Sequence, residues 1–163
     1  MSDTLLQHSP FDGGAEYIAA LNTVCSLAQH TLNIFDKDFA DSGFGTEVRY
    51  DVLRHFLLRS PHNRLQLLAH DTQHLVRYCP RMMILLREFS HSMAIHQTPA
   101  HLRHVTEPFA VADESHSVRR YHFDDMRGLL AQNDPASARI LNARFQEMWL
   151  PSHAGATPTK LGL

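Results

Sequence analysis

Hydrophobic residues along the first two thirds of the chain follow two periods in turn, one typical of helices and one typical of buried strands. Apolar residues that recur three and four positions apart indicate one face of a helix, whereas short continuous apolar runs between turn residues indicate strands. The helical pattern covers about 15–31 and 46–58, and a third helical region begins after Asp71, its expected N-cap, with a kink or break expected at Pro80. The strand pattern follows each helical segment, over 32–35, 65–69 and 93–96.

The pattern changes after residue 105, where apolar runs follow one another without a helix between them. Phe109–Ala112 and Val118–Phe123 are predicted to be strands joined by a hairpin across residues 113–116. A last helix is marked by Asp134, which can cap it, and it ends before Pro151.

The order of these elements predicts a single three-layer α/β domain over residues 13–151, with a mostly parallel sheet and helices on both faces. Residues 1–12 and 152–163 are expected to be tails. Sheets of this kind bind ligands beyond the carboxyl ends of their parallel strands. Candidate functional residues are therefore sought where predicted strands end.

The composition limits the classes of protein. The 163 residues are 44% hydrophobic and 20% charged, and a chain of this length buries a core without disulfides or a metal. No apolar run approaches the roughly 20 residues of a membrane-spanning helix, and the first residues lack the features of a secretory signal. Cys25 and Cys79 lie far apart within helical patterns, which favours buried free thiols in a reducing compartment. We therefore expect a cytoplasmic protein without membrane insertion and without a cofactor.

Charge is unevenly distributed although the net charge is only −2. Residues 1–41 contain six acidic residues against Lys37, whereas residues 46–90 contain seven arginines against four acidic residues. A basic face in the middle third is one interpretation. Solvated helix surfaces are the other, and we prefer it because exposed arginines are common.

The order and spacing of the predicted elements resemble one half of a phospholipase D-like domain over about residues 15–150. The leading strands would be 32–35, 65–69 and 93–96, and Phe109–Ala112, followed by Asp113, would be the strand that carries the active site. Because enzymes of this superfamily join two such halves across a pseudo-twofold axis, the resemblance implies that a chain with one half forms a symmetric homodimer.

The catalytic motif of that superfamily is a histidine, one residue, a lysine, four residues and an aspartate. Its histidine attacks phosphorus and its lysine neutralises the developing charge. If Asp113 takes the aspartate position, Thr106 stands at the histidine position and Pro108 at the lysine position. Neither residue can do the work of the one it replaces, and none of the thirteen histidines has a lysine two residues later. The resemblance therefore implies a degenerate motif without the usual mechanism.

Two other constellations could carry chemistry. His101 and His104 lie three apart, and they could bind a metal with one or two further ligands from among His96, Asp113 and His116; surface histidines are the simpler interpretation. Asp36 and Asp38 follow the first predicted strand and resemble the Asp-x-Asp of haloacid dehalogenase-like phosphatases. A loop of solvated acids is the interpretation we prefer for that pair, since no later acidic pair follows an apolar strand.

Basic residues near an aromatic ring raise the question of nucleic acid binding. Arg119, Arg120 and Tyr121 lie on one predicted strand, but strand alternation sends the two arginines to opposite faces of the sheet. Only one of the two can therefore point into a given groove.

The preferred hypothesis is a non-catalytic interaction or regulatory domain that forms a homodimer and binds a protein partner or an anionic ligand such as a phosphate or a nucleic acid. Its ligand-binding residues would line a shallow pocket near the end of the Phe109–Ala112 strand: His104, Thr106, Asp113 and Arg120. The alternative is a divergent phosphodiesterase or nuclease whose site was rebuilt from His101, His104 and Asp113, with or without a metal. The two hypotheses differ in whether these side chains converge.

Overall fold

All strands of the protein belong to one sheet of eight, as the computed structural model of residues 5–157 shows. The strand order is β1-β7-β6-β5-β2-β3-β4-β8. The strands span Gln7–Asp12 (β1), Thr31–Asp36 (β2), Arg64–Ala69 (β3), Met93–Gln97 (β4), Phe109–Ala112 (β5), His116–His122 (β6), Asp125–Gln132 (β7) and His153–Ala156 (β8). The five strands predicted from apolar runs correspond to β2, β3, β4, β5 and β6, and they occupy the middle of this order.

The sheet is mixed. Strands β2, β3 and β4 are parallel to one another, and all other neighbouring strands are antiparallel. The α/β class with helices on both faces is confirmed, and the parallel part of the sheet is limited to these three strands. The predicted hairpin joins β5 to β6, with Ala112 opposite His116.

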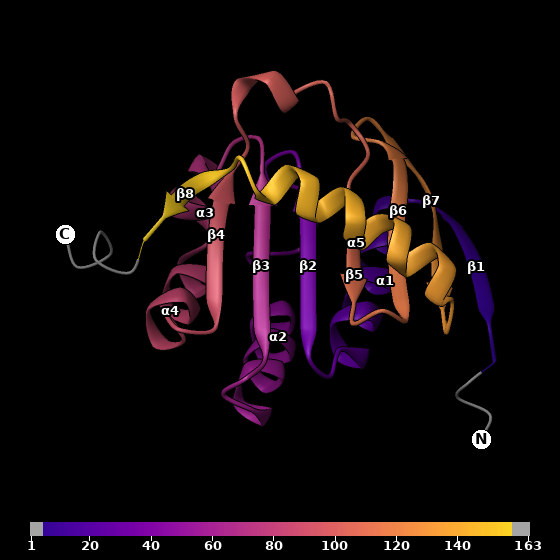
Figure 1. The fold of residues 1–163 in the computed structure, drawn as a ribbon, viewed down its shortest axis with the longest axis horizontal. Helices are drawn as coiled ribbons and strands as arrows, with labels where there is room; N and C mark the ends of the chain where they lie inside the picture. The colour runs from indigo at the N-terminus through magenta and orange to yellow at the C-terminus, as the bar shows by residue number, and fades with distance from the viewer. Residues whose placement is uncertain (1–4, 158–163) are drawn as a thin grey trace.

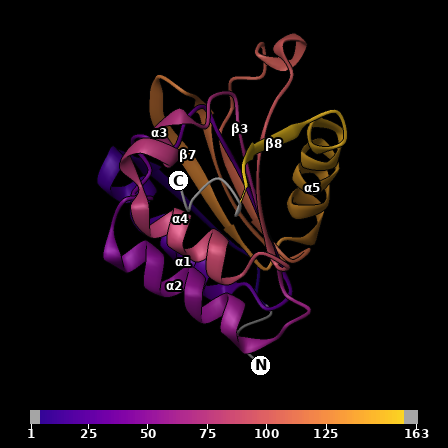
Figure 2. The ribbon, with the colours of Figure 1, turned by 90° about the vertical axis from the view of Figure 1, so that its left-hand side faces the viewer.

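Helices cover the two faces of the sheet unequally. Helices α1 (Gly14–Leu27), α2 (Glu47–Arg59), α3 (Gln73–Tyr78) and α4 (Pro80–Glu88) lie on one face. Helix α5 (Pro135–Trp149) crosses the strands on the other face (Figures 1 and 2). Asp134 caps α5 as predicted, because its carboxylate accepts the N–H of Ser137 at 3.2 Å.

Each face has its own hydrophobic core. The larger core joins the first four helices to the sheet, and its fully buried members include Leu21, Leu53 and Leu67. The smaller core lies beneath α5 and includes Phe35, Phe109, Phe145 and others. Cys25 and Cys79 are both buried and free in the larger core, as expected.

Three strands were not expected. Residues 7–12 and 153–156 were expected to lie in tails, but they form the edge strands β1 and β8, and β7 lies where no strand was predicted. Apart from Phe11, all five residues of β1 are exposed polar residues or proline, so the strand carries little apolar signal. The rest of the two expected tails, residues 1–4 and 158–163, lies outside the described residues.

The third helical region is divided at Pro80 into α3 and α4, as the sequence predicts. The N-cap of α3 is Thr72 rather than Asp71, although the Asp71 carboxylate accepts the N–H of Gln73 at 2.8 Å. Within residues 5–157, no helix combines the length and the apolar character needed to cross a membrane.

Candidate functional site

The parallel strands β2, β3 and β4 end at one edge of the sheet, which we call the carboxyl edge. Strand β5 begins at this edge, because it runs antiparallel to β2 with Phe109 opposite Phe35. The turn between β6 and β7 lies there as well. A loop of residues 98–108, which contains a short 3-10 helix (Ala100–Leu102), rises above the edge (Figure 1). Ligands of open α/β sheets usually bind at such an edge.

Thr106 and Pro108 lie in the last part of this loop, where it joins β5. The carbonyl oxygen of Thr106 accepts the N–H of Phe123 at 2.8 Å, and that of Pro108 accepts the N–H of Arg120 at 3.0 Å. These bonds extend the pairing between β5 and β6 toward the carboxyl edge. Pro108 is buried and Thr106 is half-buried.

His70 directly follows β3 and is the buried histidine of the carboxyl edge. Its Nδ1 lies 2.6 Å from Thr98 Oγ1, and its Nε2 lies 2.7 Å from the carbonyl oxygen of Val105. Since a carbonyl oxygen only accepts, Nε2 donates, and Nδ1 of the neutral ring accepts from the hydroxyl. Burial lowers the pKa of His70, the bond to Val105 acts in the opposite sense, and the neighbouring Arg103 and His104 lower the pKa further. Both ring nitrogens are thus used to hold the loop.

Phenylalanine rings surround His70 at this edge. The ring centroid of Phe35 lies 5.1 Å from that of His70, and the ring centroid of Phe123 lies 5.7 Å from it, both in edge-to-face contact. Phe35 also packs against Phe109, at 5.7 Å between centroids. Apolar rings therefore occupy the space between β2, β5 and the β6–β7 turn. Sequence reasoning did not select His70, although its position directly after the predicted strand 65–69 was a signal.

The loop and α5 enclose a surface hollow that contains two of the predicted ligand-binding residues. His104 and Thr106 line it from the loop. The other lining residues are Leu102, Val105, Glu107, Arg144, Glu147 and Met148. Arg144 Nη1 lies 3.3 Å from Glu107 Oε1, and both side chains are well exposed.

A second hollow lies between α5 and strands β6 and β7. It is lined by Ser117, Arg119, Leu129, Ala131, Ser137, Ile140, Leu141 and Arg144. Because Arg144 lines both hollows, we treat them together as the α5 groove. The guanidinium carbon of Arg119 lies 5.8 Å from the ring centroid of Tyr121, and no carboxylate within residues 5–157 forms an ion pair with Arg119.

The other two predicted ligand-binding residues, Asp113 and Arg120, lie outside the α5 groove. Asp113 is at the opposite end of β5, where its carboxylate accepts the N–H groups of His30 and Thr31 at 2.8 and 3.0 Å. Arg120 is buried and faces α1, with its guanidinium carbon 4.7 Å from the ring centroid of Tyr17. The structure thus brings His104 and Thr106 together but separates them from Asp113 and Arg120. The predicted separation of Arg119 and Arg120 onto opposite faces is confirmed.

The remaining histidines of interest do not gather around one point. His104 Nδ1 donates to the carbonyl oxygen of His101 at 3.0 Å. The ring of His96 stacks on Trp149 at 3.9 Å, and His116 Nδ1 accepts the N–H of Asn133 at 3.1 Å. Among residues 5–157, no three side chains of histidine, cysteine, aspartate or glutamate are placed to hold a metal ion.

Asp36 and Asp38 have different surroundings. Asp36 is buried, and its carboxylate accepts the N–H of Lys37 at 2.6 Å and the hydroxyl of Ser42 at 2.8 Å. Burial raises the pKa of Asp36. Asp38 is half-buried and accepts the N–H of Ala40 at 3.0 Å. Both side chains therefore help to shape the loop after β2.

The arginines of residues 46–90 differ in their surroundings too. Arg49 is fully buried, Arg54 forms an ion pair with Glu88 at 3.1 Å, and Arg59 donates to a backbone carbonyl. The contacts of Arg54 and Arg59 agree with the interpretation of separate helix-surface groups, whereas Arg49 belongs to neither interpretation because it is buried.

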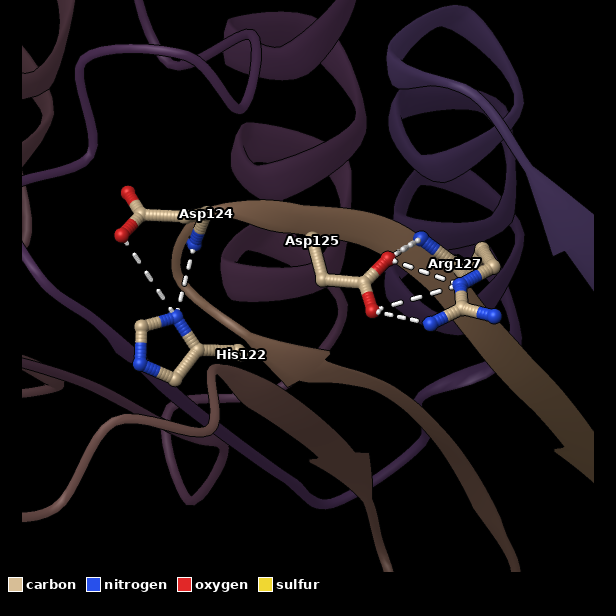
Figure 3. A network of polar contacts seen from close by, with 4 residues as sticks. All are labelled: His122, Asp124, Asp125 and Arg127. Carbon is tan, nitrogen blue, oxygen red and sulfur yellow. Dashed lines mark hydrogen bonds and ion pairs between the residues drawn. The ribbon is translucent and has the colours of Figure 1, made fainter.

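The β6–β7 turn carries a polar network at the carboxyl edge (Figure 3). His122 Nδ1 accepts the N–H of Asp124 at 3.0 Å. Asp125 accepts from the backbone N–H of Arg127 at 2.9 Å and from its guanidinium at 2.8 Å, and these bonds lower the pKa of Asp125 to about 2. The network closes a tight turn, and the positive charge of Arg127 is already paired there.

The fold is that of a phospholipase D-like domain. Nuc, a phospholipase D family member from Salmonella typhimurium, has 10% identity and a TM-score of 0.65, with 92% of this chain and 97% of that chain covered. NucT from Helicobacter pylori has 11% identity and a TM-score of 0.61, with 92% and 99% covered. At such identities the likeness shows the fold alone.

A third structure with this fold is TrmBL2, an archaeal chromatin protein described as having a novel mode of DNA binding. It has 12% identity and a TM-score of 0.67, with 91% of this chain covered, and this chain spans 54% of it. The protein belongs to the family described as a domain of unknown function, DUF7931, whose model matches residues 14–157. No curated protein sequence matches the chain.

Proposed function

We propose that the protein is a non-catalytic phospholipase D-like domain that binds an anionic ligand, of which nucleic acid is our choice, and that it forms a homodimer. The observation that carries the non-catalytic part is the composition of the carboxyl edge. Thr106 and Pro108 stand where a catalytic histidine and lysine are expected, and phenylalanine rings pack against the buried histidine beside them.

The chemistry of nucleophilic attack supports this reading of the edge. A histidine nucleophile needs a free ring nitrogen that can reach phosphorus. Both ring nitrogens of His70 are hydrogen-bonded, to Thr98 and to Val105. A phosphoryl group also needs a positive charge to neutralise its oxygens in the transition state, and Pro108 cannot provide one.

Anion binding is assigned to the α5 groove. Arg119 and Arg144 line it, and the hydroxyls of Ser117 and Ser137 line the same hollow. Guanidinium and hydroxyl groups are the donors that most often contact phosphate oxygens. Tyr121, close to Arg119 and 46% exposed, offers a ring on which a base can stack. The DNA binding described for TrmBL2, which shares the fold, is a further reason to test nucleic acid first.

The test measures binding of a fluorescent single-stranded oligonucleotide by anisotropy at several salt concentrations. The double variant Arg119→Ala/Arg144→Ala is compared with Arg54→Ala/Arg87→Ala, which removes a partly exposed and an exposed arginine from the helices on the opposite face. We expect the first variant to reduce the slope of log K against log salt by about 1.4, since each phosphate contact on a single strand contributes about 0.7. Equal loss in both variants would mean that the groove is not the binding site.

A hydrolysis assay separates this proposal from the alternative of a rebuilt phosphodiesterase site. The purified protein is mixed with an activated phosphodiester, with chelator or with added zinc or magnesium, and compared with His104→Ala and Asp113→Ala. We expect no turnover in any condition, because Asp113 and His104 lie at opposite ends of β5. Turnover that either substitution abolishes would establish a catalytic site and overturn the non-catalytic proposal.

The homodimer is tested separately by sedimentation equilibrium over a range of protein concentrations. A reversible monomer and dimer equilibrium, or a stable dimer, supports the proposal. A monomer at every concentration would overturn the homodimer part of the proposal. Anion binding would then be a property of the single chain, and a different protein partner would be sought.

A further inference from the structure

Four polar side chains are buried together on the face of the sheet opposite the α5 groove. Tyr17 comes from the first turns of α1, Asp36 from the end of β2, Arg49 from α2 and Arg120 from β6. Their exposed fractions are 1%, 5%, 0% and 4%. Each of the four acts electrostatically on at least one of the others, so they form one cluster across four elements.

Arg49 has few acceptors for a buried guanidinium. Its Nε donates to Asn22 Oδ1 at 2.6 Å, and its Nη2 lies 3.5 Å from the carbonyl oxygen of Ile18. The guanidinium carbon lies 4.5 Å from the ring centroid of Phe44. No atom of residues 5–157 accepts a hydrogen bond from its Nη1. A fully buried guanidinium thus keeps at least one N–H donor without a protein acceptor.

Arg120 and Tyr17 are incompletely paired in the same way. The guanidinium of Arg120 lies over the ring of Tyr17, and its Nη1 donates to Met126 Sδ, a weak acceptor, at 2.7 Å. Within the described chain, neither Arg120 Nε nor the hydroxyl of Tyr17 has a hydrogen-bond partner. Buried polar groups without partners are rare because each costs free energy, so three of them in one cluster indicate a missing acceptor.

The charges of the cluster do not balance. Arg49 and Arg120 contribute two positive charges, and Asp36 contributes at most one negative charge. The carboxylate of Asp36 is occupied by Ser42 and the N–H of Lys37, and neither arginine forms an ion pair among the described residues. An uncompensated charge in a low-dielectric interior is costly. One further negative charge would neutralise the cluster.

We propose that this cluster binds a small monovalent inorganic anion of the chloride class, held by the Tyr17 hydroxyl and the free N–H groups of Arg49 and Arg120. All three groups can donate to an anion, and one such anion supplies both the absent acceptor and the absent charge. The residues around the cluster pack closely, which favours a small anion. Phe39 and Phe44 are buried in the loop between β2 and α2, and Gly43 of that loop approaches Arg49 so closely that an added Cβ would lie 3.3 Å from Nη2.

The first test is thermal unfolding in chloride, with gluconate added to keep the ionic strength constant. An anion that binds only the folded protein raises Tm by mass action, by roughly 5–10 °C when chloride reaches about one hundred times its Kd. We expect a saturable rise in the natural protein and a much smaller one in Tyr17→Phe, which keeps the ring and removes the donor. The control Arg87→Met, which removes an exposed arginine, should keep the full rise. The same Tm in chloride and gluconate would overturn the proposal.

The second test does not depend on how the variants fold. Crystals grown in bromide should show an anomalous peak between Tyr17, Arg49 and Arg120, because bromide replaces chloride in such sites. A water molecule at this position, or no anomalous peak, would overturn the proposal. Because the cluster lies on the other face of the sheet from Arg119 and Arg144, loss of oligonucleotide binding in the α5 groove and loss of the chloride effect are separate results.

Discussion

The carboxylate of Asp113 accepts the backbone N–H of His30 at 2.8 Å, although 83 residues separate the two along the chain. It also accepts the N–H groups of Gln29 and Thr31 at 3.0 Å each. The residue that stands at the aspartate position of a degenerate catalytic motif therefore ties the β5–β6 turn to the start of β2. Its backbone supports this role, since Asp113 adopts a left-handed conformation with φ of 57°.

Asp113→Ala is expected to lower the free energy of unfolding by about 1–3 kcal/mol, because three backbone N–H groups lose a charged acceptor. Asp113→Asn should lose less, since its amide oxygen can still accept and asparagine tolerates a left-handed backbone. Urea unfolding measures both variants. An Asp113→Ala variant as stable as the natural protein would contradict this structural role. The oligonucleotide affinity of the folded variant should be unchanged.

Gly128→Ala is expected to be destabilising, because a Cβ at this position would lie 2.1 Å from the carbonyl oxygen of Arg119 and 2.5 Å from the ring of Phe11. The backbone of β6 cannot move away without breaking its pairing with β7. We therefore expect the free energy of unfolding to fall by about 1–3 kcal/mol. Gly14→Ala is the matched control, since its nearest neighbour would be Met126 at 3.9 Å. Comparable Tm values for the two variants would contradict the close approach.

Stability is expected to fall as the pH drops below about 6.5, the ordinary pKa of histidine. Burial lowers the pKa values of His70, His96 and His116 in the folded protein. At acid pH the unfolded chain therefore binds more protons than the folded protein, which favours unfolding. Above about pH 6.5 these histidines are neutral in both states, and their contribution to stability is fully present. Measured between pH 7.5 and 5, Tm should fall less steeply in His70→Gln than in the natural protein. Parallel curves would argue against His70 as a contributor.

Neither cysteine should react readily with a thiol reagent while the protein is folded. Burial raises the pKa of Cys25 to about 11 and raises that of Cys79 as well, so little thiolate is present near pH 8. Absorbance at fixed reagent concentration should show slow modification in buffer and rapid modification of both thiols in urea. Fast reaction of one thiol in buffer would show that the segment around it opens locally.

The sequence predicts most strongly those elements whose signal is local. Strand β5 has the predicted bounds, Phe109–Ala112, because it is a continuous apolar run that is buried on both faces. Helix α5 has the predicted cap and the predicted end because capping residues and proline act within a few positions. The paired strands β1 and β7 were missed, since backbone hydrogen bonds between distant segments require no apolar pattern in either.

The candidate site shows the same limit. Strand alternation predicts that Arg119 and Arg120 face opposite ways, but it does not show that Arg120 packs on Tyr17, a residue 103 positions earlier in helix α1. The grouping of His104, Thr106, Asp113 and Arg120 failed to form a single pocket because Asp113 lies at the far end of β5 and Arg120 faces α1 on the other face of the sheet. The position of His70 beside the loop depends on the parallel pairing of β3 with β4, which sequence spacing alone does not fix.

The two outer strands restrict how copies of this protein can meet. Strand β8 has only four residues, and β1 contains Pro10, which has no N–H to donate. Short or proline-containing outer strands discourage a second sheet from adding itself through backbone hydrogen bonds. Any self-association of the protein is therefore expected to use side chains on a face of the molecule, and to stop at a defined number of copies rather than grow into a fibre.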